Sequence, residues 1–181
     1  VTAVRREALP GGGERATVLS GMEAGWTRTL PPADIVVWVA QSRRYRGVPA
    51  GAADMVAVNV AAFFELIDWA ARSGVRRVVY ASSGSVYART GGLLSEREPT
   101  AATTMYAATK LSAEHLLAQY AGVFEIVTAR VFAVYGPGQT GMAVANVVDA
   151  VLARRPVTLT EGVGMTFTPI FVDDAAAVFS A

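Results

Sequence analysis

Short apolar runs alternate along this chain with longer segments of helix-favouring composition. Valine-rich, isoleucine-rich and aromatic runs predict strands over 1–4, 35–40, 76–81, 124–132, 156–159 and 169–172. Helices are predicted over 53–73, 103–120 and 143–153, and a last one after Asp173 or Asp174, either of which is a suitable N-cap. The alternation predicts an α/β fold with a Rossmann-like, doubly wound parallel sheet and helices on both faces.

The run Ile35–Ala40 has no polar residue, as is typical of a parallel strand covered on both faces. We therefore expect it to be a buried central strand. With 181 residues and 52% hydrophobic residues, the chain is long enough for one core, so we expect 1–181 to form a single partial domain.

Charge and cysteine content narrow the classes of function. The 16 basic and 15 acidic residues leave a net charge of +1 and are spread along the chain, so no nucleic-acid-binding stripe is predicted. The chain has no cysteine and no apolar run near the roughly 20 residues of a membrane helix. We expect a cytoplasmic setting, with no membrane or nucleic-acid partner.

Tyr106 and Lys110 lie four residues apart in a predicted helix, so they share one face. A nearby ammonium group favours the phenolate and is expected to lower the tyrosine pKa. The alternative is an exposed helical pair with no role. Lys110 is the only lysine, and chance would place it four after one of the 6 tyrosines in roughly 3% of shuffled sequences.

Residues 78–87 run from a predicted strand into a loop of small residues that contains Ser82, Ser83 and Ser85. Active-site residues of parallel sheets lie beyond the carboxyl ends of the strands. A serine there can hydrogen-bond both a substrate oxygen and a tyrosine hydroxyl. The alternative is an ordinary turn after a strand.

Taken in order, these motifs resemble the extended short-chain dehydrogenase/reductases of the NAD-dependent epimerase/dehydratase family, typified by nucleotide-sugar epimerases. The resemblance spans essentially the whole chain. Its elements are the strand into Trp38-Val39-Ala40, Asn59, Gly74-Val75-Arg76, the Val-Tyr-x-Ser-Ser loop, Glu98-Pro99, Tyr106-x-x-x-Lys110, Arg130, Val134-Tyr135-Gly136-Pro137-Gly138 and Val172-Asp173-Asp174.

The resemblance implies that Tyr106 is the catalytic acid/base, that Lys110 lowers its pKa and holds the nicotinamide ribose, and that Ser83 orients the substrate oxygen. The same comparison implies a cofactor site. Its residues are Val39, Ala40, Gln41 and Ser42 in one loop, together with Asn59, Tyr106, Lys110 and Phe132. The resemblance also implies that residues 139–181 begin the substrate-binding portion.

Arg5 and Arg6 close the first predicted strand, where relatives that prefer NAD carry an acidic residue for the adenosine ribose. Guanidinium groups suit the 2′-phosphate of NADP, so the cofactor is expected to be NADP or NAD, with NADP slightly favoured. The alternative is that both are solvated loop arginines.

The sequence departs from the family where its glycine-rich strand, turn and helix should lie. No Gly-x-x-Gly-x-x-Gly motif is present, and Gly11-Gly12-Gly13 follows the wrong strand. The fold is therefore expected to be incomplete at both ends. The missing strand would lie between the strands at Val1 and Ile35, leaving their edges unpaired or paired with each other.

Substrate motifs also differ from the family. Gly84 and Ser85 stand where 4,6-dehydratases of similar sequence carry Asp-Glu, which argues against dehydratase activity. Ala133 replaces an asparagine that contacts the nucleotide sugar, and Thr166 and Phe167 lie near the usual position of a phosphate-binding arginine. These positions leave the substrate open.

Two hypotheses follow. The first is an NAD(P)-dependent epimerase or reductase, an isomerase or oxidoreductase acting on a nucleotide sugar or a related hydroxyl/keto substrate. The alternative is a non-catalytic or degenerate fragment of the fold that acts as a dimerisation or binding module. Helix 53–73 is apolar on more than one face. The family resemblance implies that this helix and helix 103–120 form a homodimer interface.

Overall fold

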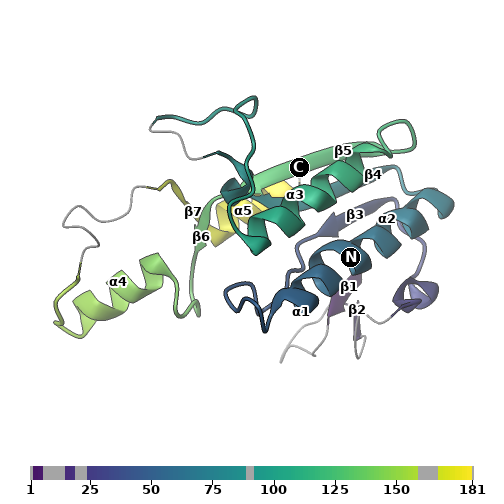
Figure 1. The fold of residues 1–181 in the computed structure, drawn as a ribbon. Coiled ribbons are helices and arrows are strands. Elements are labelled where there is room, and N and C mark those ends of the chain that lie inside the picture. The colour runs from purple at the N-terminus through teal and green to yellow at the C-terminus, as the bar shows by residue number, and fades with distance from the viewer. Residues whose placement is uncertain (1, 6–14, 19–23, 89–91, 159–166, 181) are drawn as a thin grey trace. The chain divides into compact units, whose positions relative to one another are not determined.

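The computed structural model describes residues 2–5, 15–18, 24–88, 92–158 and 167–180, with backbone only for 2–5 and 15–18. The chain divides into two compact units, Val1–Ala129 and Arg130–Ala181. Every paired strand for which a register is defined is parallel, as the alternation of strands and helices predicts (Figure 1).

The first unit contains two sheets. Strand β1 (Thr2–Arg5) pairs with β2 (Arg15–Val18), a short strand that the sequence pattern does not reveal. Strands β3 (Ile35–Trp38), β4 (Arg77–Ser83) and β5 (Glu125–Val131) form a second sheet in the order β3-β4-β5. Strands β1 and β3 therefore do not pair with each other; each has a different partner.

One helical run connects β3 to β4. It consists of α1 (Ala52–Val56), a π-helical segment η2 (Ala57–Ala62) and α2 (Phe63–Arg72). Gly74 follows with a φ of 72°, a left-handed conformation that glycine adopts without a Cβ clash. The predicted helix 53–73 is confirmed, but its π turn is not visible in the sequence pattern.

Helix α3 (Met105–Ala118) connects β4 to β5. Thr104 caps it, because its hydroxyl accepts a hydrogen bond from the Ala107 N–H at 3.1 Å. Helices α2 and α3 pack side by side, and Figure 1 shows them in front of strands β3 to β5. The short 3-10 helices η1 (Trp26–Thr29) and η3 (Gly84–Val86) precede β3 and follow β4.

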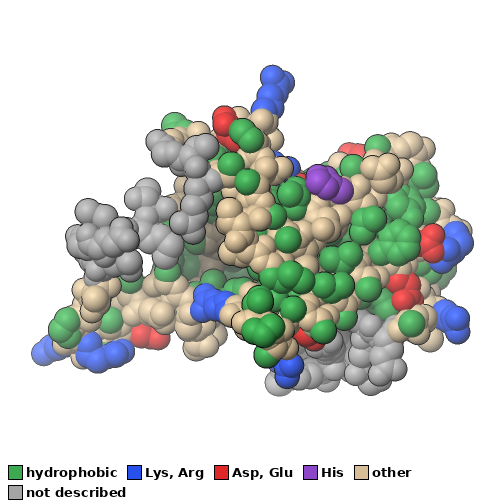
Figure 2. Space-filling model, in the orientation of Figure 1, with side chains coloured by type: hydrophobic (Ala, Val, Ile, Leu, Met, Phe, Trp, Pro, Cys, Tyr) green, Lys and Arg blue, Asp and Glu red, His purple; other side chains and the backbone are tan. Residues whose placement is uncertain are grey.

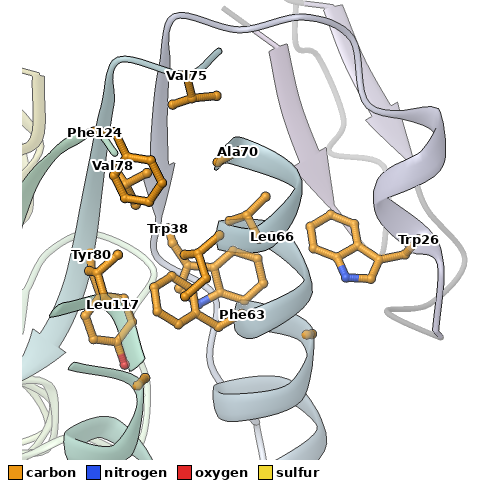
Figure 3. Packing of buried hydrophobic residues seen from close by; sticks show 13 residues of the cluster. Trp26, Trp38, Phe63, Leu66, Ala70, Val75, Val78, Tyr80, Leu117 and Phe124 are labelled. Carbon is orange, nitrogen blue, oxygen red and sulfur yellow. The ribbon is translucent and has the colours of Figure 1, made fainter. Parts of the chain in front are cut away.

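The core of this unit lies between α2, α3 and the strands (Figure 3). The Phe63 ring stacks on Tyr80 with centroids 4.5 Å apart and lies 5.6 Å from the Trp38 ring. Leu117 brings α3 into the same cluster. This packing holds the carboxyl ends of β3 and β4 next to the first turns of α3.

The expectation of a central strand at Ile35–Ala40 is wrong for the described residues. The strand ends at Trp38 and lies at the edge of its sheet. Trp38 is buried, but Ile35 and Val37 on the opposite face are 49% and 44% exposed. The apolar run predicts cover on both faces, whereas α2 and α3 cover only one.

The second unit contains β6 (Ala133–Tyr135) paired with β7 (Pro169–Phe171), and helices α4 (Ala143–Leu152) and α5 (Val172–Ser180). The strand predicted over 156–159 is absent from 156–158, and 159 lies outside the described residues. Helix α5 begins at Val172, so Asp173 and Asp174 lie in its first turn rather than before it. No helix in the described ranges is both long and apolar enough to span a bilayer.

Candidate active site

Four of the residues that the sequence singles out meet at one edge of the β3-β4-β5 sheet. Gln41 follows strand β3, Ser83 ends β4, and Tyr106 and Lys110 lie in the first half of α3. Because β3 and β4 are parallel, their carboxyl ends lie at the same edge. The tertiary structure thus brings together segments separated by 65 residues of sequence.

The Tyr106 hydroxyl donates a hydrogen bond to Oε1 of Gln41 at 3.0 Å. The Tyr45 ring, from the loop after β3, lies 5.4 Å from the Tyr106 ring and is tilted by 52°. Arg46 in turn lies over the Tyr45 ring, with Cζ 5.1 Å from the ring centroid. The loop after β3 therefore supplies both a polar and an aromatic contact to this phenol.

The Ser83 hydroxyl lies at the start of η3 and accepts two hydrogen bonds from Ser85, from N at 3.2 Å and from Oγ at 2.9 Å. A serine hydroxyl has two acceptor sites and one donor. Its donor is therefore left for another group. The Ser83 side chain favours the ionised form of Tyr106.

Burial raises the pKa of Tyr106 above its usual value, and the neighbouring Tyr45 raises it further, whereas the Ser83 hydrogen bond lowers it. The sequence-based expectation of a lowered pKa is therefore not met in this structure. That expectation rests on the ammonium of Lys110, whose Nζ lies 6.0 Å from the Tyr106 ring centroid. Loss of solvent around the phenol is the largest cause of the shift.

Lys110 is buried, with 2% of its surface exposed, and its Nζ donates to the Ala81 carbonyl at 2.8 Å. The same Nζ lies 5.1 Å from the centroid of the Tyr80 ring, within the range of a cation–π contact. Burial lowers the pKa of Lys110 to about 8. An ammonium has three donors, so two remain for other partners after the Ala81 bond.

A buried hydrogen-bond network links the loop after β3 to α3. The Ser42 N–H donates to Oδ1 of Asn59 at 2.9 Å, and Nδ2 of Asn59 donates to the Thr109 hydroxyl at 3.0 Å. Thr109 donates to the Tyr106 carbonyl at 2.9 Å. Asn59 lies in the π-helical segment, which directs its side chain between the two elements.

The other predicted cofactor residues are placed differently. Val39 is 62% exposed, and Ala40 is partly buried against the core. Phe132 belongs to the second unit, so its distance from Tyr106 is not defined. Arg5 closes β1 but its side chain is not described, and Arg6 lies outside the described residues.

A protein-family model described as "NAD dependent epimerase/dehydratase family" matches residues 24–181. The chain belongs to this family. The described residues contain no cluster of histidine and acidic side chains suited to a metal ion.

Named relatives of this epimerase/dehydratase chain support the assignment. It is 34% identical over 130 residues to the UDP-glucose 4-epimerase of Mycolicibacterium smegmatis, covering 67% of this chain and 42% of that protein. It is 33% identical over 104 residues to the uncharacterized UDP-glucose epimerase YtcB of Bacillus subtilis, covering 56% and 33%. The chain thus spans less than half of either relative.

A solved structure described as MoeE5 in complex with UDP-glucose and NAD matches the fold with a TM-score of 0.79 and 29% identity. The match covers 99% of this chain and 62% of that one. The expected Rossmann-like α/β fold is confirmed, and the chain corresponds to only part of the length of that structure.

Sequence reasoning did not identify several side chains around the site of this family member. They are Tyr45, Thr109 and Glu114. Glu114 is buried, accepts a hydrogen bond from the Ser82 hydroxyl, and lies four residues after Lys110. Helical spacing could have revealed Glu114 and Thr109, whereas nothing in the local pattern marks Tyr45.

Proposed function

We propose that this chain carries the proton-transfer site of an NAD(P)-dependent epimerase or reductase that acts on a nucleotide sugar or a related hydroxyl/keto substrate. The observation that carries the proposal is the placement of Ser83, Tyr106 and Lys110 at the carboxyl ends of β3 and β4. Ligands of open α/β sheets bind beyond these ends.

Tyr106 is proposed as the catalytic acid/base that exchanges a proton with the sugar oxygen. A phenol does this when it is held within hydrogen-bond reach and its charge can be stabilised as the proton leaves. Ser83 has one free donor, which orients the substrate oxygen or the phenol. The Lys110 ammonium stabilises the phenolate as it forms, although it does not dominate the resting pKa of Tyr106.

The residues fit the nicotinamide half of a dinucleotide better than its pyrophosphate half. Lys110 retains two donors after its bond to Ala81, which suits ribose hydroxyls beside Tyr106. The sequence contains no glycine-rich turn of the kind whose backbone amides bind a pyrophosphate. A bound nicotinamide dinucleotide supplies hydride exchange with the substrate carbon.

NAD is named in the MoeE5 structure, and a preference for NADP rests only on Arg5 and Arg6. We therefore propose NAD or NADP, with the two arginines as the residues that decide between them. The substrate is proposed to be a UDP-linked sugar, because UDP-glucose appears in the names of the relatives and in the MoeE5 complex.

The test begins with titration of NADH and NADPH into the chain, followed by fluorescence, for the wild type and Tyr106→Phe. UDP-glucose is then incubated with NAD or NADP, and chromatography measures UDP-galactose. We expect micromolar binding in both proteins and a roughly 10²-fold to 10⁴-fold lower rate in Tyr106→Phe, since only the proton donor is removed.

The outcomes separate the two hypotheses for this chain. Dinucleotide binding with turnover that Tyr106→Phe abolishes supports the enzyme. Failure to bind either dinucleotide supports the alternative of a non-catalytic or degenerate fragment that acts as a dimerisation or binding module. Equal turnover in the wild type and Tyr106→Phe contradicts the assignment of Tyr106.

A further inference from the structure

The hydroxyl of Tyr106 has one proton to donate, and in this structure Gln41 Oε1 receives it. Its oxygen remains free to accept a hydrogen bond, and the neighbouring Ser83 favours the ionised form of Tyr106. A phenol that donates its proton to an amide oxygen is neutral.

The backbone beside Gln41 is held firmly even though the Gln41 side chain is exposed. Ser42 is fully buried, and its N–H donates to Asn59 at 2.9 Å. The Ser42 hydroxyl donates to Asp54 and accepts from the Arg44 N–H at 3.0 Å. Asn59 joins this loop to Thr109 in α3, so the amide and the phenol are anchored to one network.

We propose that Gln41 is a positioning residue. Its side-chain oxygen accepts the hydrogen bond from the Tyr106 hydroxyl and keeps the phenol aligned in its protonated state. This role rests on the proposed function of Tyr106 as acid/base. It differs from the lining of a cofactor pocket, which the family resemblance implies for Gln41. A substrate oxygen that takes the proton replaces the Gln41 amide as the acceptor, because the phenol has only one proton.

When Tyr106 ionises, the Gln41 amide can bond it only as a hydrogen-bond donor and no longer as an acceptor. A phenolate only accepts, so Gln41 must rotate its amide to present Nε2–H or leave the contact. An acceptor at this position opposes ionisation, since a hydrogen bond to the neutral form disfavours the charged form. Gln41 is thus expected to raise the pKa of Tyr106 in addition to the effect of burial.

Several titratable groups also face Tyr106, and all remain unchanged when Gln41 is replaced. Tyr45 comes from the loop after β3, Tyr80 from β4, and Lys110 from the next turn of α3. Arg46 lies behind Tyr45. A change in the titration of Tyr106 in Gln41→Ala is therefore attributable to loss of the amide, whereas Gln41→Glu adds the effect of a new charge.

The experiment measures ionisation of Tyr106 directly in the chain labelled with ¹³Cζ-tyrosine, by NMR as a function of pH. The Tyr106 signal is assigned by its loss in Tyr106→Phe. Gln41→Glu places a carboxylate acceptor beside the phenol and is expected to move the titration to higher pH. Gln41→Ala admits water, which donates to a phenolate, and is expected to move it to lower pH.

Gln119→Glu is the matched control, because it introduces the same charge at the C-cap of α3, about 20 Å along the helix from Tyr106. It is expected to leave the titration unchanged. The signals of the other tyrosines report whether each variant keeps its fold. The readout is the order in which Tyr106 of the wild type and of each variant begins to ionise as pH rises. The early part of each titration curve is enough to establish this order.

Shifts of opposite sign in Gln41→Glu and Gln41→Ala support the proposal. Unchanged titration in both, shifts of the same sign, or an equal shift in Gln119→Glu overturns it. The measurement needs neither dinucleotide nor sugar. If the two Gln41 variants shift the titration in opposite directions but the chain shows no turnover, the result counts against the proposed function and not against the role of Gln41.

Discussion

Lys110 is buried, with 2% of its surface exposed. Burial lowers the pKa of its ammonium group from 10.5 to about 8. Between these values the unfolded chain binds more protons than the folded chain, so the free energy of unfolding rises with pH. The contribution of Lys110 to the free energy of unfolding is therefore least favourable below pH 8.

We predict that Lys110→Met is more stable than the wild type near neutral pH, and that the difference shrinks by about 3 kcal/mol as pH rises to 10.5. Urea unfolding over this range measures it. Tyr80 and Tyr106, whose pKa values burial raises, oppose the trend at the highest pH but are present in both proteins. Parallel pH curves for the two proteins would contradict the prediction.

At the residue scale, helical spacing was enough to place Tyr106 and Lys110 together, because side chains four apart share one face. The direction of the Tyr106 pKa was not accessible from spacing. It depends on burial and on Tyr45, which another segment of the chain brings into contact. The Gln41 contact likewise joins residues 65 apart.

Helix α3 presents Tyr106 in its first turn, so its N-terminus matters for both stability and the site. Thr104 caps it through the Ala107 N–H at 3.1 Å. We predict that Thr104→Ala lowers the free energy of unfolding by about 1 kcal/mol, because that N–H loses its partner. Urea unfolding provides the measurement.

Thr103→Ala is the matched control for the cap. Thr103 is exposed and adjacent, and the structure assigns the cap to Thr104. Its replacement is expected to change stability by less than about 0.5 kcal/mol. Equal losses in the two variants would show that Thr104 has no specific capping role.

At the element scale, composition predicted the helical run 53–73 but not its π turn at Ala57–Ala62. The extra residue in a π turn changes which side chains share a face, and here Asn59 lies within it. Asn59 then bonds Ser42 on one side and Thr109 on the other. Such a turn is stabilised by tertiary hydrogen bonds that a local pattern does not encode.

The helices α1, η2, α2 and α3 leave apolar side chains on their outer face. Val56 and Phe64 are 42% and 44% exposed, and apolar side chains gather over the face formed by α2 and α3 (Figure 2). Exposed apolar patches mark interaction sites in soluble proteins. We propose a homodimer through these helices, as the family resemblance implies.

For the whole molecule, we predict that the chain has twice the mass of one copy by light scattering at micromolar concentration. Phe64→Glu is expected to give monomers, because a charge buried in an apolar interface is costly. Leu93→Glu is the matched control, since Leu93 is fully exposed and belongs to none of these helices. A monomeric wild type, or a dimer unaffected by Phe64→Glu, would contradict the proposal.

The sequence alone determined the α/β class, the order of the main strands and helices, the family and the pairing of Tyr106 with Lys110. These follow from local periodicity and from motifs that lie within a few residues of each other. Only the tertiary structure decided that β3 lies at a sheet edge, that β1 pairs with β2, and that Gln41 accepts the Tyr106 proton. These features depend on which segments meet and how much water they exclude, and neither quantity is a property of any single stretch of sequence.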